Sequence, residues 1–224
     1  MSIEVETKDC TAISDAELDE MADISAGGPA AFDVGFLSKQ REEWVLITQA
    51  RDGGRLQGFS FCTLERIGGT PSLLIGLASV KRTAKRESVL RALMSDQYRR
   101  AVLAFPDEDV LVGSRLATAS GFQALRGLED IVPRPGHRAT GEERAWGRRL
   151  AKRFGAEGRI DDRTFILGGD EQVAGVLDHD ALKPEVIDAD VAAFFEEVNL
   201  GRRDSLVAFG WAMAEDLASH AVGR

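Results

Sequence analysis

Apolar and polar positions follow a short-range pattern in the middle of the chain that predicts three β-strands joined by tight turns. The strands are expected at residues 44–48, 59–64 and 72–80. Gly-Gly pairs at 53–54 and 68–69 separate them and supply the backbone freedom that a tight turn needs. The third strand is almost wholly apolar, which is typical of a central strand covered on both faces. The segment is therefore predicted to form a three-stranded meander.

Further strands and helices are predicted on both sides of this meander from the spacing of apolar positions and from capping signals. Residues 3–7 alternate like a short strand, and a capping box of Ser14 and Glu17 is expected to open a helix, because each side chain can accept a hydrogen bond from the other residue's free amide. Two longer helices are predicted over residues 32–43 and 81–105. Short strands are predicted at residues 110–112 and 131–132. This order favours an α/β fold with a mixed, largely antiparallel sheet flanked by helices.

From about residue 136 onward the sequence predicts mostly helices. A second capping box, Thr140 with Glu143, is expected to open a basic helix that stops at Gly155, and a strand is predicted at 163–167. Helices are predicted over residues 190–198 and 204–220. Four apolar side chains recur at helical spacing in the last one and could serve the core or a homodimer interface: Leu206, Phe209, Met213 and Leu217.

The composition is that of a globular protein with an acidic surface. Of the 224 residues 44% are hydrophobic and 29% are charged, and the formal net charge is −9. This charge argues against a general nucleic-acid binder and against attraction to anionic membranes. The amino terminus lacks a basic or apolar leader pattern, and no apolar run is long enough to span a bilayer. A cytoplasmic protein is therefore expected.

Cysteine and histidine show no recognisable metal-binding or disulfide pattern. The two cysteines form no framework, and the three histidines lack ligand spacing such as His-Glu-x-x-His. No metal site is predicted. The run Asp178-His179-Asp180 is interpreted as an exposed turn.

Positive charge is concentrated directly after the third meander strand. Residues 81–100 carry seven Lys or Arg against two acids, although the chain as a whole is acidic. Three of these cations fall near the start of the predicted helix: Arg82, Lys85 and Arg86. Free amides and the positive end of the helix dipole favour an anion at such a position. A phosphate-bearing ligand is one interpretation, and simple solvation of an exposed helix start is the other.

The order of elements, with a Gly121-Phe122 corner after the last core strand, resembles the GNAT acetyltransferase superfamily over about residues 3–135. The resemblance implies that the strand at 72–80 splays from its neighbour, that acetyl-CoA lies in the gap, and that the following loop binds the pyrophosphate. Amides of the splayed strand would polarise the acyl carbonyl. The coenzyme-binding residues implied are Leu77, Ala78, Ser79, Val80, Arg82, Lys85, Arg86 and Ser88.

The chain departs from the GNAT pattern in two places. The family's loop has the form Arg/Gln-x-x-Gly-x-Gly/Ala, and here Lys85, Ser88 and Leu90 stand at those positions, so both glycines are missing. The three basic side chains near the helix start could offset this loss. The family commonly places a tyrosine as general acid after the fifth strand. Here Tyr98 lies in the preceding helix instead, and Ser120 is one of the few hydroxyls at the expected place.

Two residues are candidates for the general base. Glu65, at the end of the second meander strand, could deprotonate an amine directly or through water, and it could equally be a solvated hairpin residue beside Arg66. His137 lies in a Pro-Gly-His-Arg loop, where it is either an acid/base group or an ordinary surface histidine.

Two function hypotheses from different classes follow. Residues 1–135 are expected to form a GNAT-like core, and residues 136–224 a mostly helical C-terminal extension packed on that core or on a partner subunit. The leading hypothesis is an acyl-CoA-dependent N-acyltransferase that uses acetyl-CoA and no metal and acts on a small-molecule or peptide amine. The alternative is a non-catalytic GNAT-like module that binds a ligand or a partner, including as a dimeric scaffold.

Overall fold

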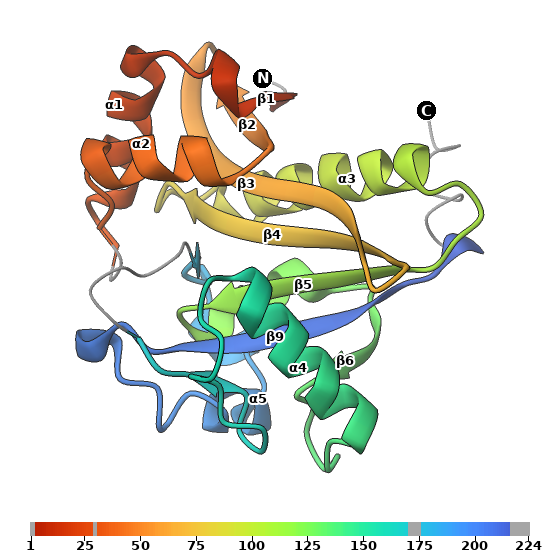
Figure 1. Ribbon diagram of the computed structural model, residues 1–224. Helices are drawn as coiled ribbons and strands as arrows, with labels where there is room; N and C mark the ends of the chain where they lie inside the picture. Colours follow the sequence, from red (N-terminus) through yellow and green to blue (C-terminus); the bar gives the residue numbers. More distant parts are fainter. Residues whose placement is uncertain (1–2, 29–30, 170–175, 216–224) are drawn as a thin grey trace.

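The computed structural model describes residues 3–28, 31–169 and 176–215 (Figure 1). Its elements up to residue 132 follow the predicted order. They are β1 (Glu4–Asp9), α1 (Asp15–Ser25), α2 (Val34–Glu43), β2 (Leu46–Asp52), β3 (Arg55–Ile67), β4 (Thr70–Val80), α3 (Arg86–Ala104), β5 (Val110–Leu116), the 3-10 helix η2 (Ala119–Leu125) and β6 (Glu129–Val132). The later elements are α4 (Gly141–Arg153), β7 (Ile166–Leu167), β8 (Leu177–Asp178), α5 (Ala189–Ala193) and β9 (Ser205–Ala212).

The described strands form one mixed sheet. They run in the order β1-β2-β3-β4-β8-β5-β9-β6, with β7 paired to β9 at one side. Pairing is antiparallel except where β4, β5 and β8 meet. The predicted GNAT-like α/β fold with a largely antiparallel sheet is confirmed by this order.

Local signals in the sequence account for the ends of several elements. Ser14 accepts a hydrogen bond from the amide of Glu17 and the Glu17 carboxylate accepts one from the amide of Ser14, which confirms the first capping box. Thr140 and Glu143 form the second in the same way at the start of α4. The Gly-Gly turns at 53–54 and 68–69 have φ between 57° and 92°, a region that favours glycine.

Helices cover both faces of the sheet. In Figure 1, α1, α2 and α4 lie in front of it and α3 lies behind. Apolar side chains on β4 alternate accordingly, because Leu73 and Ile75 belong to the core under α3 whereas Leu74 belongs to the core under α4. This two-faced burial explains why β4 reads as a continuous apolar run.

β4 and β5 pair only over part of their length. They are parallel neighbours at Ser72–Ile75 and Leu111–Ser114, and beyond these residues they diverge. This divergence, called the β4–β5 gap below, is the splay that the GNAT resemblance implies. β8 lies inside it, paired with β4 at Ala78 and Ser79 and with β5 at Leu116.

The prediction of a helix over residues 204–220 is wrong for residues 205–212. Ser205–Ala212 is strand β9, antiparallel to both β5 and β6. Leu206, Val207 and Ala208 are consecutive and all fully buried, as in a strand covered on both faces. Leu206 and Phe209 therefore belong to the chain's own core and do not form a free stripe for a partner. Leu217 lies outside the described residues.

Residues 133–204 form an insertion between two neighbouring strands of the sheet. β6 ends at Val132, which pairs with Phe209 of β9, and the chain between these two strands contributes the short strands β7 and β8 to the same sheet. Strands from both sides of residue 135 thus share one sheet. The expected helical extension is corrected in the same respect: it supplies α4 and the short α5, and it also supplies β7, β8 and β9.

Candidate functional site

The segment from residue 176 to 181, called the β8 segment below, fills the β4–β5 gap. The amide of Ala78 donates to the carbonyl of Val176, and the amide of Ala117 donates to the carbonyl of Leu177, each at 3.2 Å. The Leu177 side chain is fully buried and belongs to the core under α3. The Ala78 amide, one of the β4 groups that the GNAT resemblance assigns to the acyl carbonyl, is therefore hydrogen-bonded to the chain itself.

Arg82, at the end of β4, is held by two carboxylates of the β8 segment. Its Nε donates to Asp180 Oδ2 at 2.7 Å and its Nη2 donates to Asp178 Oδ1 at 3.0 Å. The Asp178 side chain has no exposed surface. Burial raises the pKa of Asp178, and the Arg82 guanidinium opposes this shift. The two carboxylates thus take the place at Arg82 where a phosphate was expected.

Gly28, which follows α1, packs directly against this ion pair. A Cβ added at Gly28 would lie 2.3 Å from Asp178 Oδ2 and 2.6 Å from Arg82 Nη2. The backbone after α1 therefore approaches the pair as closely as only glycine allows. The pair is enclosed by elements from three distant parts of the sequence.

The remaining basic residues near the start of α3 also contact their own chain. Lys85 forms an ion pair with Asp52 at the end of β2. Arg86 Nε donates to the carbonyl of Thr83 at 2.8 Å. The structure brings the predicted coenzyme residues together at one end of the gap: Leu77, Ala78, Ser79, Val80, Arg82, Lys85, Arg86 and Ser88. Each of the three cations among them forms an ion pair or a hydrogen bond with another group of the chain.

The interpretation of residues 178–180 as an exposed turn is wrong. Asp178 and His179 are each only 1% exposed. His179 Nε2 lies 3.2 Å from Gln123 Oε1 and 3.5 Å from Glu87 Oε2. Burial lowers the pKa of His179, so the ring is held toward its neutral form, and Glu87 opposes this shift.

The three candidate catalytic residues do not converge. Glu65 on β3 is paired with Arg153 in the last turn of α4, whereas His137 is paired with Glu143 in the first turn of the same helix, at 2.6 Å and 2.8 Å. The length of α4 separates these two pairs by roughly 15–20 Å. Ser120 is buried in η2. The structure therefore places these three side chains in three separate environments.

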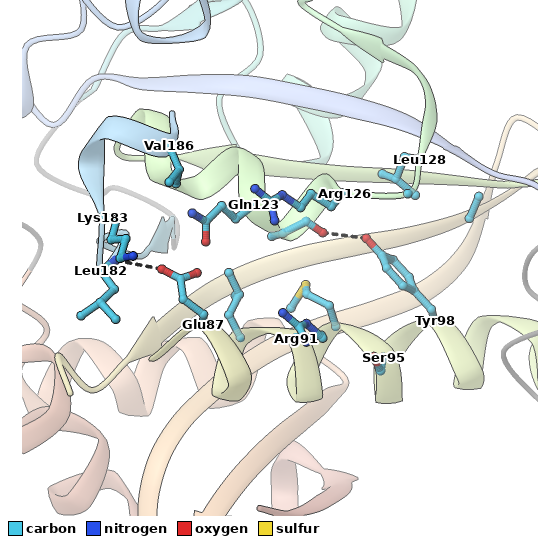
Figure 2. A pocket seen from close by; sticks show the side chains of 15 residues that line it. Glu87, Arg91, Ser95, Tyr98, Gln123, Arg126, Leu128, Leu182, Lys183 and Val186 are labelled. Carbon is cyan, nitrogen blue, oxygen red and sulfur yellow. Dashed lines mark hydrogen bonds between the residues drawn. The ribbon is translucent and has the colours of Figure 1, made fainter. Parts of the chain in front are cut away.

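A cavity that the sequence analysis missed lies between α3 and η2. Its volume is about 570 Å³, and Figure 2 shows it bounded by α3 on one side and by η2 on the other. Tyr98 crosses one end and donates from its hydroxyl to the carbonyl of Ala124 at 2.8 Å. At the other end, the amide of Leu182 donates to Glu87 Oε1 at 2.8 Å. No local motif marks this cavity, because its walls come from α3, η2 and the insertion.

The described part of the chain holds neither a metal-binding cluster nor a membrane-spanning helix. No group of three or more His, Cys, Asp or Glu side chains there is arranged to hold a metal ion. No described helix combines the length and apolar character needed to cross a bilayer.

Comparison with known proteins gives similarity at the level of structure alone. The sequence matches no family model and no curated protein. An aminoglycoside 6'-acetyltransferase type Ii is similar over 58% of this chain and 86% of its own, at 10% identity and a TM-score of 0.44. The ribosomal-protein-S18-alanine N-acetyltransferase from Escherichia coli is similar over 62% and 86%, at 12% identity and a TM-score of 0.42. The fold assignment rests on the strand order of the chain itself.

Proposed function

We propose that this protein is a GNAT-like binding module that does not use the β4–β5 gap for a coenzyme. The observation that carries this proposal is the β8 segment inside the gap. Its carbonyls accept from Ala78 and Ala117, and its carboxylates neutralise Arg82. The ligand site available to the module is then the cavity between α3 and η2.

The energetic argument rests on the ion pair between Arg82 and Asp178. A coenzyme entering the gap would have to separate this pair and leave a buried carboxylate without its partner. Breaking a buried ion pair costs about 3–5 kcal/mol. Since 1.4 kcal/mol is a tenfold change in affinity, coenzyme binding would be weakened by roughly a hundredfold or more.

The second candidate is an acyl-CoA-dependent N-acyltransferase that uses acetyl-CoA on an amine acceptor. It is favoured by the basic residues at the end of β4, which lie where the GNAT resemblance expects a pyrophosphate. It requires the β8 segment to leave the gap. It also requires an acid and a base, and the candidates Glu65 and His137 are engaged in ion pairs at opposite ends of α4.

Calorimetric titration with acetyl-CoA and with free CoA separates these functions. The binding module is expected to give no micromolar binding to either compound, with folding verified by circular dichroism. Micromolar binding to the wild type that is lost in the double variant Lys85→Ala/Arg86→Ala would overturn the proposal and favour the acyltransferase. Lys39→Ala/Arg55→Ala, at two exposed cations on α2 and β3, is the matched control for a general loss of positive charge.

The identity of the amine or other partner, a homodimer and a cytoplasmic location remain predictions. The net charge of −9 supports a partner other than nucleic acid.

A further inference from the structure

The cavity between α3 and η2 combines an apolar floor with charged walls. Leu90 and Met94 of α3 are buried beneath it, and Leu128 and Val186 contribute apolar surface from the other side. Methionine and leucine side chains adapt to apolar ligands of varied shape. A volume of about 570 Å³ lies within the range of small-molecule sites. The lining thus fits a ligand with an apolar body.

Three cations lie on the walls of this cavity: Arg91, Arg126 and Lys183. None of their side chains forms a hydrogen bond or ion pair with another residue that the structure describes. Figure 2 shows Arg91 on α3 and Arg126 beyond η2 on opposite sides of the opening. Guanidinium groups on facing walls favour an anionic group between them.

The acidic groups of the lining do not neutralise these cations. Glu87 is the one carboxylate among the lining residues, and it accepts from the amide of Leu182 and lies near His179. The cavity therefore carries an excess of two positive charges in a chain whose net charge is −9. By contrast, Arg82 in the β4–β5 gap forms ion pairs with both Asp178 and Asp180.

We infer that the cavity binds a small amphipathic anion, with an apolar chain on the floor and a carboxylate or phosphate head between Arg91 and Arg126. This inference deepens the proposed function, since it names the ligand class of the binding module. A cationic amine is disfavoured at this site because three like charges surround it. An uncharged lipid would leave the arginines without a counter-charge.

Four probes of equal chain length test the head group: decanoate, decyl phosphate, decanol and decylammonium, each titrated calorimetrically below its micelle-forming concentration. We expect one-to-one binding of decanoate or decyl phosphate, at least tenfold tighter than that of decanol and decylammonium. The comparison of the two anions tells a carboxylate ligand from a phosphate ligand. Equal affinity for all four probes, or no binding of any, overturns the inference.

Substitutions in the cavity lining test whether the anion binds in the cavity. Arg91→Gln/Arg126→Gln is expected to weaken the preferred anion at least tenfold. Arg55→Gln/Arg138→Gln, at two exposed arginines outside the cavity, is the matched control and should bind as the wild type does. Ser95→Trp places a large ring at the exposed rim and should block binding while the fold is kept. Unchanged binding in Ser95→Trp, or an equal loss in the control, contradicts the inference.

Titration of acetyl-CoA into the same samples distinguishes a failure of the proposed function from a failure of the inference about the cavity. If acetyl-CoA binds the wild type and Ser95→Trp equally, the proposed function fails, whatever decanoate does. If neither acetyl-CoA nor any decyl probe binds, the inference about the cavity fails and the argument from the filled gap stands.

Discussion

The β4–β5 gap and the α3–η2 cavity lie close together. The insertion fills the gap, whereas it forms only one wall of the cavity and leaves it open. In the gap, Leu177 fills the space between the strands, and Asp178 and Asp180 neutralise Arg82. In the cavity, Leu182 and Lys183 of the same insertion form one wall, yet the cations remain without a described counter-charge. Strand order alone therefore does not define the ligand site, because side chains from a distant segment decide which space stays open.

Removal of the Arg82 side chain should give the largest effect. Arg82→Ala leaves Asp178 buried without its partner, so we expect a loss of about 3–5 kcal/mol in the free energy of unfolding, measured by urea denaturation at pH 7. Lys85→Ala is the control, since its pair with Asp52 is half exposed at the lysine. This variant should lose no more than about 1 kcal/mol. Equal losses in the two variants would show that the gap is not sealed by its ion pair.

The pH dependence of Arg82→Ala follows from the burial of Asp178. Burial raises the pKa of this carboxyl in the folded state, and loss of the arginine removes the main opposing effect. A raised folded pKa means that the stability present below the unfolded pKa, about 3.9, is lost as pH rises through the folded pKa. The difference between wild type and Arg82→Ala should therefore be smaller near pH 4 than at pH 7. A difference that grows on acidification would contradict this explanation.

Truncation of two leucines in the insertion compares the filled gap with the cavity rim. Leu177→Ala removes a fully buried side chain between β4 and β5 and should cost about 2–5 kcal/mol in the free energy of unfolding. Leu182→Ala, at a side chain that is 44% exposed on the cavity rim, should cost less than about 1 kcal/mol. Urea denaturation of both variants provides the measurement. A larger loss in the free energy of unfolding for Leu182→Ala than for Leu177→Ala would contradict the description of the gap as filled and of the cavity rim as open.

His179 should make the stability of the β8 segment depend on pH. Burial lowers its pKa, while Glu87 and Asp180 oppose the shift and Arg86 adds to it. A lowered folded pKa means that the stability present above the unfolded value, about 6.5, is lost as pH falls through the folded pKa. We expect the free energy of unfolding to decrease between about pH 6.5 and 5. His179→Gln should flatten this slope, and an unchanged slope would show that another group causes it.

The cavity cations should contribute least to stability. Arg91 and Arg126 form no described hydrogen bond or ion pair, so replacing each by glutamine should change the free energy of unfolding by no more than about 0.5 kcal/mol. Thermal or urea unfolding in the absence of added anion is the measurement. A large loss would mean that these side chains serve the fold, and the contrast with Arg82 would disappear.

Much of the fold could be predicted from local patterns. The alternation in β3, the apolar run of β4 and the two capping boxes depend on neighbours a few residues apart, and each has the structure expected of it. The candidate coenzyme residues from Leu77 to Ser88 lie together at the end of β4 and the start of α3 because they are close in sequence, and their binding of a coenzyme stays a prediction. What surrounds them was not predictable in this way, because Arg82 pairs with Asp178 across 96 residues.

Local sequence patterns are enough to place the starts of α1 and α4, the glycine turns, and the strand that is apolar on both faces. The helix predicted over Leu206 to Phe209 was wrong, because a short apolar run fits a buried strand as well as a helix, and only its position between β5 and β6 decides. The tertiary structure alone decided that the β8 segment fills the gap and that a cavity stays open beside α3. Both outcomes depend on contacts between side chains far apart in sequence, which no local pattern records.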